Sequence, residues 1–341
     1  MKSRYNLGVF IGRFQPFHLG HLHNLRIALN NCDQVVVIIG SAYRARTIKN
    51  PFTFLERKKM IESDLSLVLH DYKDRIFIRG VSDWLYDEKA WVSELISQVE
   101  IYNEIGGDIV IIGHEKDESS YYLKCFPEWG FLEVDNYLNY NATDFRKEMF
   151  ANQKLIKHNF LVSYSDDKLV HSSFNFIKRF MKSVEYNILV EEYRYVQYKE
   201  KSYNFDRYPH HEIGFFILYK DYLLVKKNTD YPFKNLIGIP SIIVSDIADI
   251  GGFFLEKLGL GIVPSQIYSK IFKSKDRGIG KNTSINVYSY DLSSLLSIRI
   301  DIKGYEWLKL SKVLVKQSEC MDDHYQIILN IVYNIYMSRV D

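Results

Sequence analysis

One segment of the chain concentrates residues that could handle phosphate: Gly12-Arg13-Phe14-Gln15-Pro16-Phe17-His18-Leu19-Gly20-His21. An apolar run precedes it and a helical pattern follows, so N–H groups at the helix start would favour phosphate oxygens. Gly12 and Gly20 allow the backbone to approach a ligand closely. His18 and His21 would project to one side of the first helical turn. With the Arg13 guanidinium, the two imidazoles could stabilise charge on a reacting phosphorus and a leaving pyrophosphate.

A second polar group lies at the far end of the same half of the chain, in Asn141-Ala142-Thr143-Asp144-Phe145-Arg146. We expect Thr143 to cap the helix that follows, since threonine is a preferred capping residue. Arg146 would then lie one turn inside the helix, where its planar guanidinium could reach a triphosphate. Alone this pattern is weak, because a capped surface helix shows it too. Paired with the first segment it becomes a strong indication of a nucleotide site.

The elements that must position these residues alternate along residues 1–150. We predict strands at residues 7–11, 35–39, 75–78 and 108–112, and helices at residues 21–29, 54–69 and 88–100. The apolar runs are continuous, as in strands that are covered on both faces. This alternation predicts an α/β domain with a parallel sheet. Ligands of such sheets bind beyond the carboxyl ends of the strands, so we expect the site in the loops after Ile11, Ile39 and Ile112.

The rest of the chain has a different texture. Residues 151–184 turn polar and then helical, and we interpret them as a connector that precedes a second domain at residues 185–341. In that domain we predict strands at 213–219, 222–226 and 285–290, a short helix at 253–258 and a final helix at 322–337. The mixture indicates an α+β domain.

Composition narrows the possible classes of protein. The 341 residues are 47% hydrophobic, and 44 Lys+Arg nearly balance 42 Asp+Glu, so charge gives no reason to expect a nucleic-acid or membrane partner. The three cysteines, Cys32, Cys125 and Cys320, show no metal-binding or disulfide spacing. The apolar runs are too short to cross a bilayer, and no signal-peptide pattern opens the chain. We therefore expect a cytoplasmic protein.

The first segment resembles the HxGH signature of the nucleotidylyltransferase superfamily, and the second resembles its ISSTxIR motif at Thr143 and Arg146. The form GRFQPFHxGH is similar to the archaeal-type nicotinamide mononucleotide (NMN) adenylyltransferases. So are Asn50-Pro51-Phe52-Thr53 with Glu56 and Arg57, and the pair Asp83 and Trp91. This resemblance implies a Rossmann-like domain that joins NMN to the adenylate of ATP, with Mg2+ bound mainly through the ATP phosphates.

The resemblance also assigns roles to individual residues. It implies that His18, His21 and Arg146 are catalytic. It implies that ATP is bound by Gly12, Arg13, Phe14, Gly20, Gly113, His114, Asn141, Thr143 and Arg146. It implies that NMN is bound by Gln15, Asn50, Phe52, Thr53, Asp83 and Trp91.

Two of the acceptor residues suit a nicotinamide ring on chemical grounds. The ring is flat and cationic, and tryptophan is the best cation–π partner among side chains, which fits Trp91. Asp83 could accept a hydrogen bond from the carboxamide. The alternatives are that Trp91 is a buried helix residue beside Leu95, and that Asp83 is a helix cap or a loop carboxylate.

The second domain resembles the Nudix hydrolase domain that follows this adenylyltransferase in bacterial fused enzymes, where it cleaves ADP-ribose. The carboxylates of the Nudix box hold the metal ions of that reaction. Here Gly252, Phe253 and Lys257 stand where the box has arginine and glutamates, and only Glu256 survives. We therefore predict a Nudix-like fold without ADP-ribose hydrolysis. The alternatives are residual hydrolysis and a role as a nucleotide-binding regulator.

The resulting hypothesis is in-line transfer, in which the NMN phosphate attacks the α-phosphorus of ATP and pyrophosphate leaves. We expect ATP and NMN as partners, no nucleic acid or membrane, and a homo-oligomer. The nearest alternative is another acceptor, either nicotinate mononucleotide or FMN.

Overall fold

The structure is a computed structural model of the whole chain, and it describes residues 5–103, 106–114, 123–135, 137, 141–151, 169–202, 211–244, 266–274, 284–295 and 303–337. The chain forms two compact units, Met1–Tyr193 and Arg194–Asp341, which are described separately below. Among the described residues, no helix combines the length and the apolar character needed to span a membrane.

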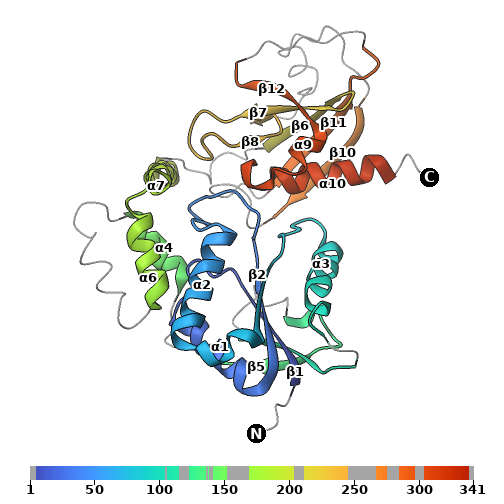
Figure 1. Cartoon of the computed structure of the whole chain (residues 1–341). Coiled ribbons are helices and arrows are strands. Elements are labelled where there is room, and N and C mark those ends of the chain that lie inside the picture. Colours follow the sequence, from blue (N-terminus) through green and yellow to red (C-terminus); the bar gives the residue numbers. More distant parts are fainter. Residues whose placement is uncertain are drawn as a thin grey trace. The chain divides into compact units, whose positions relative to one another are not determined.

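The first unit is built on a five-stranded parallel sheet in the order β3-β2-β1-β4-β5. Figure 1 labels three of its strands, β1, β2 and β5. Its strands are β1 (Tyr5–Gly12), β2 (Cys32–Ile39), β3 (Ile76–Gly80), β4 (Ile109–Gly113) and β5 (Gly130–Glu133). The chain runs from β1 outward to β3 and then returns to the other side of β1. The strand order therefore reverses between β1 and β4, and ligands of such sheets bind at the carboxyl ends beside that reversal.

Helices cover both faces of this sheet. They are α1 (Leu19–Asn31), α2 (Phe54–Val68) and α3 (Glu88–Glu100), with the short 3-10 helix η1 (His70–Arg75) before β3. Val35 and Val37 of β2 pack in one core with α1 and α2, whereas Val36 packs in another core with α3. Burial on both faces explains why the strands read as continuous apolar runs.

The three predicted helices of this half are confirmed within a few residues, and so are the four predicted strands. β5 was not predicted. The reason is its sequence, Gly-Phe-Leu-Glu, which is short and partly exposed and so lacks a long apolar run.

The helical part of the predicted connector belongs to the first unit. α4 (Ala142–Ala151), α6 (His171–Phe180) and α7 (Val184–Ser202) share a core cluster with α2 that includes Met149, Ile177 and Leu189. The Tyr186 hydroxyl donates to the carbonyl of Met149 at 2.6 Å. The two units divide between Tyr193 and Arg194, inside α7, rather than at residue 185.

The described part of the second unit is a mixed sheet with the main order β10-β11-β6-β7-β12. Its strands are β6 (His211–Tyr219), β7 (Tyr222–Lys227), β8 (Ile237–Gly238), β9 (Ser241–Val244), β10 (Gln266–Lys273), β11 (Ser284–Asp291) and β12 (Tyr305–Lys309). It also contains α9 (Leu310–Val313), the 3-10 helix η4 (Gln317–Glu319) and α10 (His324–Met337). The α+β prediction is confirmed, although the final helix begins at His324, after a left-handed Asp322. The predicted helix at 253–258, with Glu256, lies outside the described residues.

Candidate active site

Left-handed backbone gathers at the carboxyl edge of the first sheet. Phe14, Ser41 and Trp84 have φ angles of 49°, 49° and 44°, and they follow the ends of β1, β2 and β3. A left-handed conformation costs an L-residue with a side chain about 1–2 kcal/mol. Such strain persists where the surroundings hold it, and it is frequent at functional sites. This edge is therefore the first place to look for chemistry.

A cavity of about 290 Å³ opens at this edge beside the strand reversal. Both predicted phosphate segments line it. Its lining includes all the residues expected to bind ATP or to act catalytically, together with Gln15: Gly12, Arg13, Phe14, Gln15, His18, Gly20, His21, Gly113, His114, Asn141, Thr143 and Arg146. Segments from distant parts of the sequence thus meet in one place.

Three further polar residues line the cavity and were missed by the sequence analysis: Asn24, Asp135 and Tyr137. Asn24 lies three residues after His21 on α1, so the helical spacing could have revealed it. Asp135 and Tyr137 follow β5, and they escaped notice because that strand was not predicted.

The two histidines stack at the start of α1. Their ring centroids are 3.5 Å apart, and the backbone N–H of His18 donates to Nδ1 of His21 at 3.3 Å. The His21 ring also packs on Phe14 and Phe17, with centroid distances of 4.8 and 5.6 Å. Because Nδ1 accepts a hydrogen bond, the proton of a neutral His21 ring lies on Nε2. His21 is thereby oriented as an Nε2–H donor, the form that a phosphate oxygen requires.

Gly12 and Gly20 permit this close packing. A Cβ atom on Gly12 would come within 2.8 Å of the Phe14 ring, and one on Gly20 would lie 3.2 Å from the His18 ring. Any larger residue would displace the aromatic rings that hold the histidines.

Arg146 joins α4 to the loop after β1. Its side chain is buried, and it donates to the Gln15 carbonyl at 2.9 Å and to Thr143 Oγ1 at 3.0 Å. The expectation that Thr143 caps this helix is wrong. α4 begins at Ala142, and Asn141 Oδ1 accepts the N–H of Thr143 at 2.9 Å, so the asparagine satisfies the helix start and Thr143 faces Arg146.

Three of the residues expected to contact the acceptor hold the scaffold together. The Gln15 amide donates to the Phe52 carbonyl at 2.9 Å and accepts the Phe52 N–H at 3.0 Å. Thr53 is the N-cap of α2 and forms a capping box with Glu56. Asn50 differs, because its Oδ1 is buried without a hydrogen-bond partner among the described residues.

Asp83 and Trp91 lie on the β3 side of the same edge and do not line the cavity. Asp83 accepts hydrogen bonds from Ser41 Oγ at 2.7 Å and from Arg44 at 3.1 Å. It is a loop carboxylate, since the N-cap of α3 is Asp87. Trp91 is partly buried on α3 and packs against the core that contains Leu95. The structure therefore gathers the predicted ATP residues in one cavity and leaves five of the six predicted NMN residues outside it.

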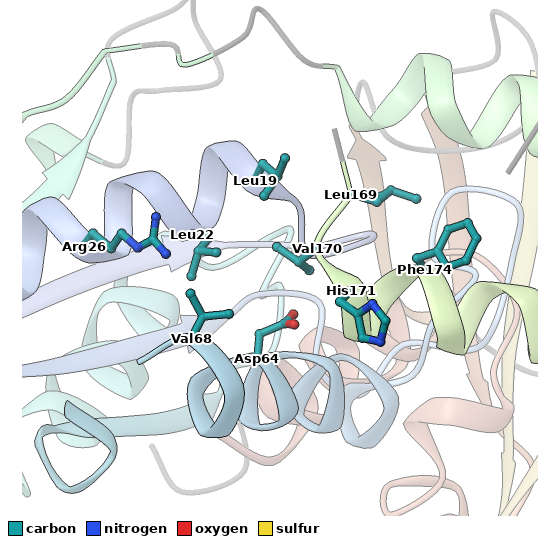
Figure 2. Close-up of a pocket in the computed structure, with 9 residues that line it drawn as sticks. All are labelled: Leu19, Leu22, Arg26, Asp64, Val68, Leu169, Val170, His171 and Phe174. Atoms are coloured by element: carbon teal, nitrogen blue, oxygen red, sulfur yellow. The ribbon is translucent and has the colours of Figure 1, made fainter. Parts of the chain in front are cut away.

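A second cavity, of about 580 Å³, lies against the opposite face of α1 (Figure 2). Figure 2 shows Leu22 and Arg26 of α1 on one side, with Asp64 of α2 and His171 of α6 across from them. Asp64 is already engaged, because it accepts the N–H of Ser172 at 3.2 Å. None of the residues predicted to bind nucleotide lines this cavity.

The cavity beside the strand reversal suits phosphate better than a bare metal ion. His18, His21, Arg13 and Arg146 surround it with nitrogen donors. No group of three histidine, cysteine or acidic residues able to hold a metal occurs among the described residues. A divalent cation fits here as a companion of the phosphates, whose oxygens are its preferred ligands.

Comparison with known proteins agrees with this geometry. The sequence model of the cytidylyltransferase-like family matches residues 9–179. The nicotinamide/nicotinic acid mononucleotide adenylyltransferase of Acinetobacter baylyi is 36% identical over 197 residues, covering 56% of this chain and 95% of that protein. This chain belongs to the nicotinamide mononucleotide adenylyltransferase family. A further relative, the nicotinamide-nucleotide adenylyltransferase of Saccharolobus solfataricus, is 30% identical over 145 residues, covering 42% of this chain and 80% of that protein.

Solved structures extend the likeness beyond the adenylyltransferase family's own domain. A bifunctional NMN adenylyltransferase/ADP ribose pyrophosphatase from Francisella tularensis matches with a TM-score of 0.83 and 32% identity, covering 96% of this chain and 99% of that one. A second structure of such a protein from the same organism, in complex with AMP and a Mn ion, gives 0.81 and 30%, covering 97% and 99%. The expected resemblance to the fused enzymes is thereby confirmed for both units.

Proposed function

We propose that the first unit transfers the adenylyl group of ATP to NMN and forms NAD and pyrophosphate. The observation that carries the proposal is the single cavity in which both phosphate motifs meet, with His21 fixed as an Nε2–H donor. A phosphate oxygen of NMN attacks the α-phosphorus of ATP. The bond from that phosphorus to the bridging oxygen breaks, and its electron pair leaves with pyrophosphate.

The residues of the cavity act by position and charge. His18 and His21 donate to oxygens of the reacting phosphate, while Arg13 and Arg146 hold the β- and γ-phosphates. No protein nucleophile is required, so the rate enhancement comes from alignment and from donors aimed at the developing charge. Mg2+ would enter as part of the ATP substrate and offset the phosphate charge. The Francisella protein was crystallised with a Mn ion, which supports the use of a divalent cation.

We further propose that NMN is the nucleotide that receives the adenylyl group. Asp83 and Asn50 offer oxygen acceptors for a carboxamide, and Trp91 offers a ring for the pyridinium. Nicotinate mononucleotide is a second candidate. The name of the Acinetobacter relative includes both the nicotinamide and the nicotinic acid mononucleotide, and Arg44, which lies next to Asp83, offers a positive charge for a carboxylate.

Product analysis tests the proposal directly. The purified chain is incubated with MgATP and, in turn, NMN, nicotinate mononucleotide or FMN. Equal amounts of NAD and pyrophosphate from NMN are the expected result. Product from FMN alone, or ATP consumption without any dinucleotide, would overturn it.

For the second unit we propose no ADP-ribose hydrolysis. The support is the sequence of residues 252–257, in which one glutamate remains of the metal-holding set. Incubation with ADP-ribose and Mg2+ or Mn2+ should release no AMP. Release of AMP and ribose 5-phosphate at a rate above that of a Glu256→Gln variant would contradict this.

A further inference from the structure

Arg57, in the first half of α2, is one of the most buried charged residues in the described part of the chain, with 1% of its surface exposed. Its guanidinium donates to four backbone carbonyls. The two Nη atoms donate to the carbonyls of Arg13 at 2.7 Å, Gly40 at 2.8 Å and Ser41 at 2.9 Å, and Nε donates to that of Thr53, the N-cap of the same helix, at 3.3 Å. No ion pair of Arg57 occurs among the described residues. Three of these four hydrogen bonds therefore go to the backbone just beyond the carboxyl ends of β1 and β2.

These carbonyls flank two of the left-handed residues. The peptide that begins at the Arg13 carbonyl leads into Phe14, and the one that begins at the Gly40 carbonyl leads into Ser41. Neither residue favours this conformation, so each position needs an external hold. One planar guanidinium supplies the hold to both loops at once.

The two loops lead to the two halves of the proposed site. Phe14 supports the His21 ring and lines the cavity. Ser41 donates to Asp83 on the proposed acceptor side. Burial lowers the pKa of Arg57 to about 10, with Arg13 acting in the same direction and Asp83 in the opposite one, so the group remains charged at neutral pH. A fixed positive charge thus lies beneath the phosphate loop.

We propose that Arg57 is a positioning residue that holds the ends of β1 and β2 in their left-handed conformations and so aligns the ATP loop with the acceptor loop. This inference rests on the proposed function only in its prediction for kcat. ATP binding depends on the same loop, and it is measured separately from NAD formation.

Arg75 provides a matched control. Its guanidinium likewise donates to backbone carbonyls, those of Leu29, Cys32 and Asp33, which lie at the amino edge of the same sheet. Lysine retains the charge at either position and loses the planar fork. Both Arg57→Lys and Arg75→Lys are therefore expected to lower the melting temperature, and only the first should disturb the site.

The experiment compares the two variants with the unchanged chain. We expect Arg57→Lys to weaken the MgATP-dependent rise in melting temperature and to lower kcat for NAD formation at least 10-fold. Arg75→Lys should leave the ATP-dependent rise intact and kcat within 2-fold. The proposal would be overturned if kcat and the ATP-dependent rise in melting temperature fell equally in both variants, or fell in neither. If the unchanged chain forms no NAD, the proposed function fails, while the ATP-dependent shift still decides the role of Arg57.

A second pair of variants works even if Arg57→Lys does not fold. Ser41→Ala and Ser41→Gly both remove the hydrogen bond to Asp83, and they differ by one methyl group and by the cost of the left-handed conformation. With Arg57 in place the clamp holds residue 41, so the two variants should have kcat values within 2-fold. A Ser41→Gly enzyme several-fold faster than Ser41→Ala would show that Arg57 does not hold this position.

Discussion

At both edges of the five-stranded sheet an arginine donates hydrogen bonds to backbone carbonyls, but the residues with left-handed backbone differ between the two edges. At the carboxyl edge Arg57 binds three carbonyls next to the left-handed residues Phe14 and Ser41. At the amino edge Arg75 also binds three carbonyls, and the left-handed residue that precedes β4 is a glycine, Gly106. Glycine adopts this conformation without strain.

Among the described residues of this unit, left-handed residues that carry a side chain occur at the carboxyl edge of the sheet. Arginines that donate to several backbone carbonyls occur at both edges, so this contact does not by itself mark a site. At the carboxyl edge it coincides with strained residues, paired histidines and the cavity that both phosphate motifs line. The contrast predicts that substitutions at the carboxyl edge change turnover, whereas those elsewhere in the unit change stability.

The largest effect is expected for His21→Ala. Loss of one donor aimed at developing charge typically lowers kcat about 10²–10³-fold. The dissociation constant for ATP should change little, because the other phosphate contacts remain. His70→Ala, in the exposed η1 at the amino edge, is the control and should retain full kcat. A His21→Ala enzyme with near-normal kcat would remove the distinction between the edges.

Arg146→Ala should follow in size. It removes a charged donor from the cavity and its bond to the Gln15 carbonyl. Hydrogen bonds to charged groups contribute about 1.5–3 kcal/mol, so kcat/KM for ATP should fall roughly 10- to 100-fold. Lys147→Ala, an exposed neighbour on α4, should leave kcat/KM unchanged. Equal effects of the two substitutions would place the ATP phosphates elsewhere.

Thr53→Ala sharpens the comparison from the side of the scaffold. Since Thr53 caps α2, its loss should lower the free energy of unfolding by about 1 kcal/mol. KM for NMN should stay the same, although the family resemblance implies that this residue contacts NMN. Urea unfolding and initial rates measure the two quantities, with Ser66→Ala on the same helix as the control. A raised KM with unchanged stability would return Thr53 to the acceptor site.

The smallest effect concerns pH. The Arg46 guanidinium forms an ion pair with Glu56, with Nη1 2.8 Å from Oε2. Burial raises the pKa of Glu56, but hydrogen bonds from Arg46 and Thr53 and the charge of Arg46 outweigh it, so the folded-state pKa is lowered. The carboxylate therefore stabilises the fold above its unfolded pKa of about 4.5, and this contribution is lost as pH falls through the folded value. Glu56→Gln should lower the free energy of unfolding at pH 7. At pH 3 the free energies of unfolding of the variant and of the unchanged chain should be closer together than at pH 7. A difference that is the same at both pH values would exclude this ion pair as the cause.

Much of the first unit could be predicted from the sequence because its signals are local. Continuous apolar runs located four strands, and the spacing of His18 and His21 placed them on one side of α1. The rule for parallel sheets placed the first phosphate segment at the carboxyl edge, whereas the pairing with Asn141–Arg146 came from the family resemblance. β5 could not be predicted because its sequence is short and partly exposed. Asp135 and Tyr137, which follow it, could not be predicted for the same reason.

The roles of several motif residues could not be predicted, because they depend on contacts between distant segments. Gln15 pairs with the backbone of Phe52, and Arg57 binds carbonyls on two other loops. A sequence pattern identifies such residues but does not say whether the side chain faces ligand or backbone. The division inside α7 was hidden for the same reason, since α6 and the first part of α7 join the core with α4.

The most direct test of the central claim is a crystal structure of the chain with NMN and a non-hydrolysable ATP analogue that has a methylene group between the α- and β-phosphorus atoms. We expect the analogue in the cavity at the β1–β4 reversal, with its α-phosphate within hydrogen-bond distance of His21 Nε2 and its outer phosphates at Arg13 and Arg146. The NMN phosphate should lie in line with the α-phosphorus. Binding of the analogue outside this cavity, or with its α-phosphate remote from His21, would contradict the account.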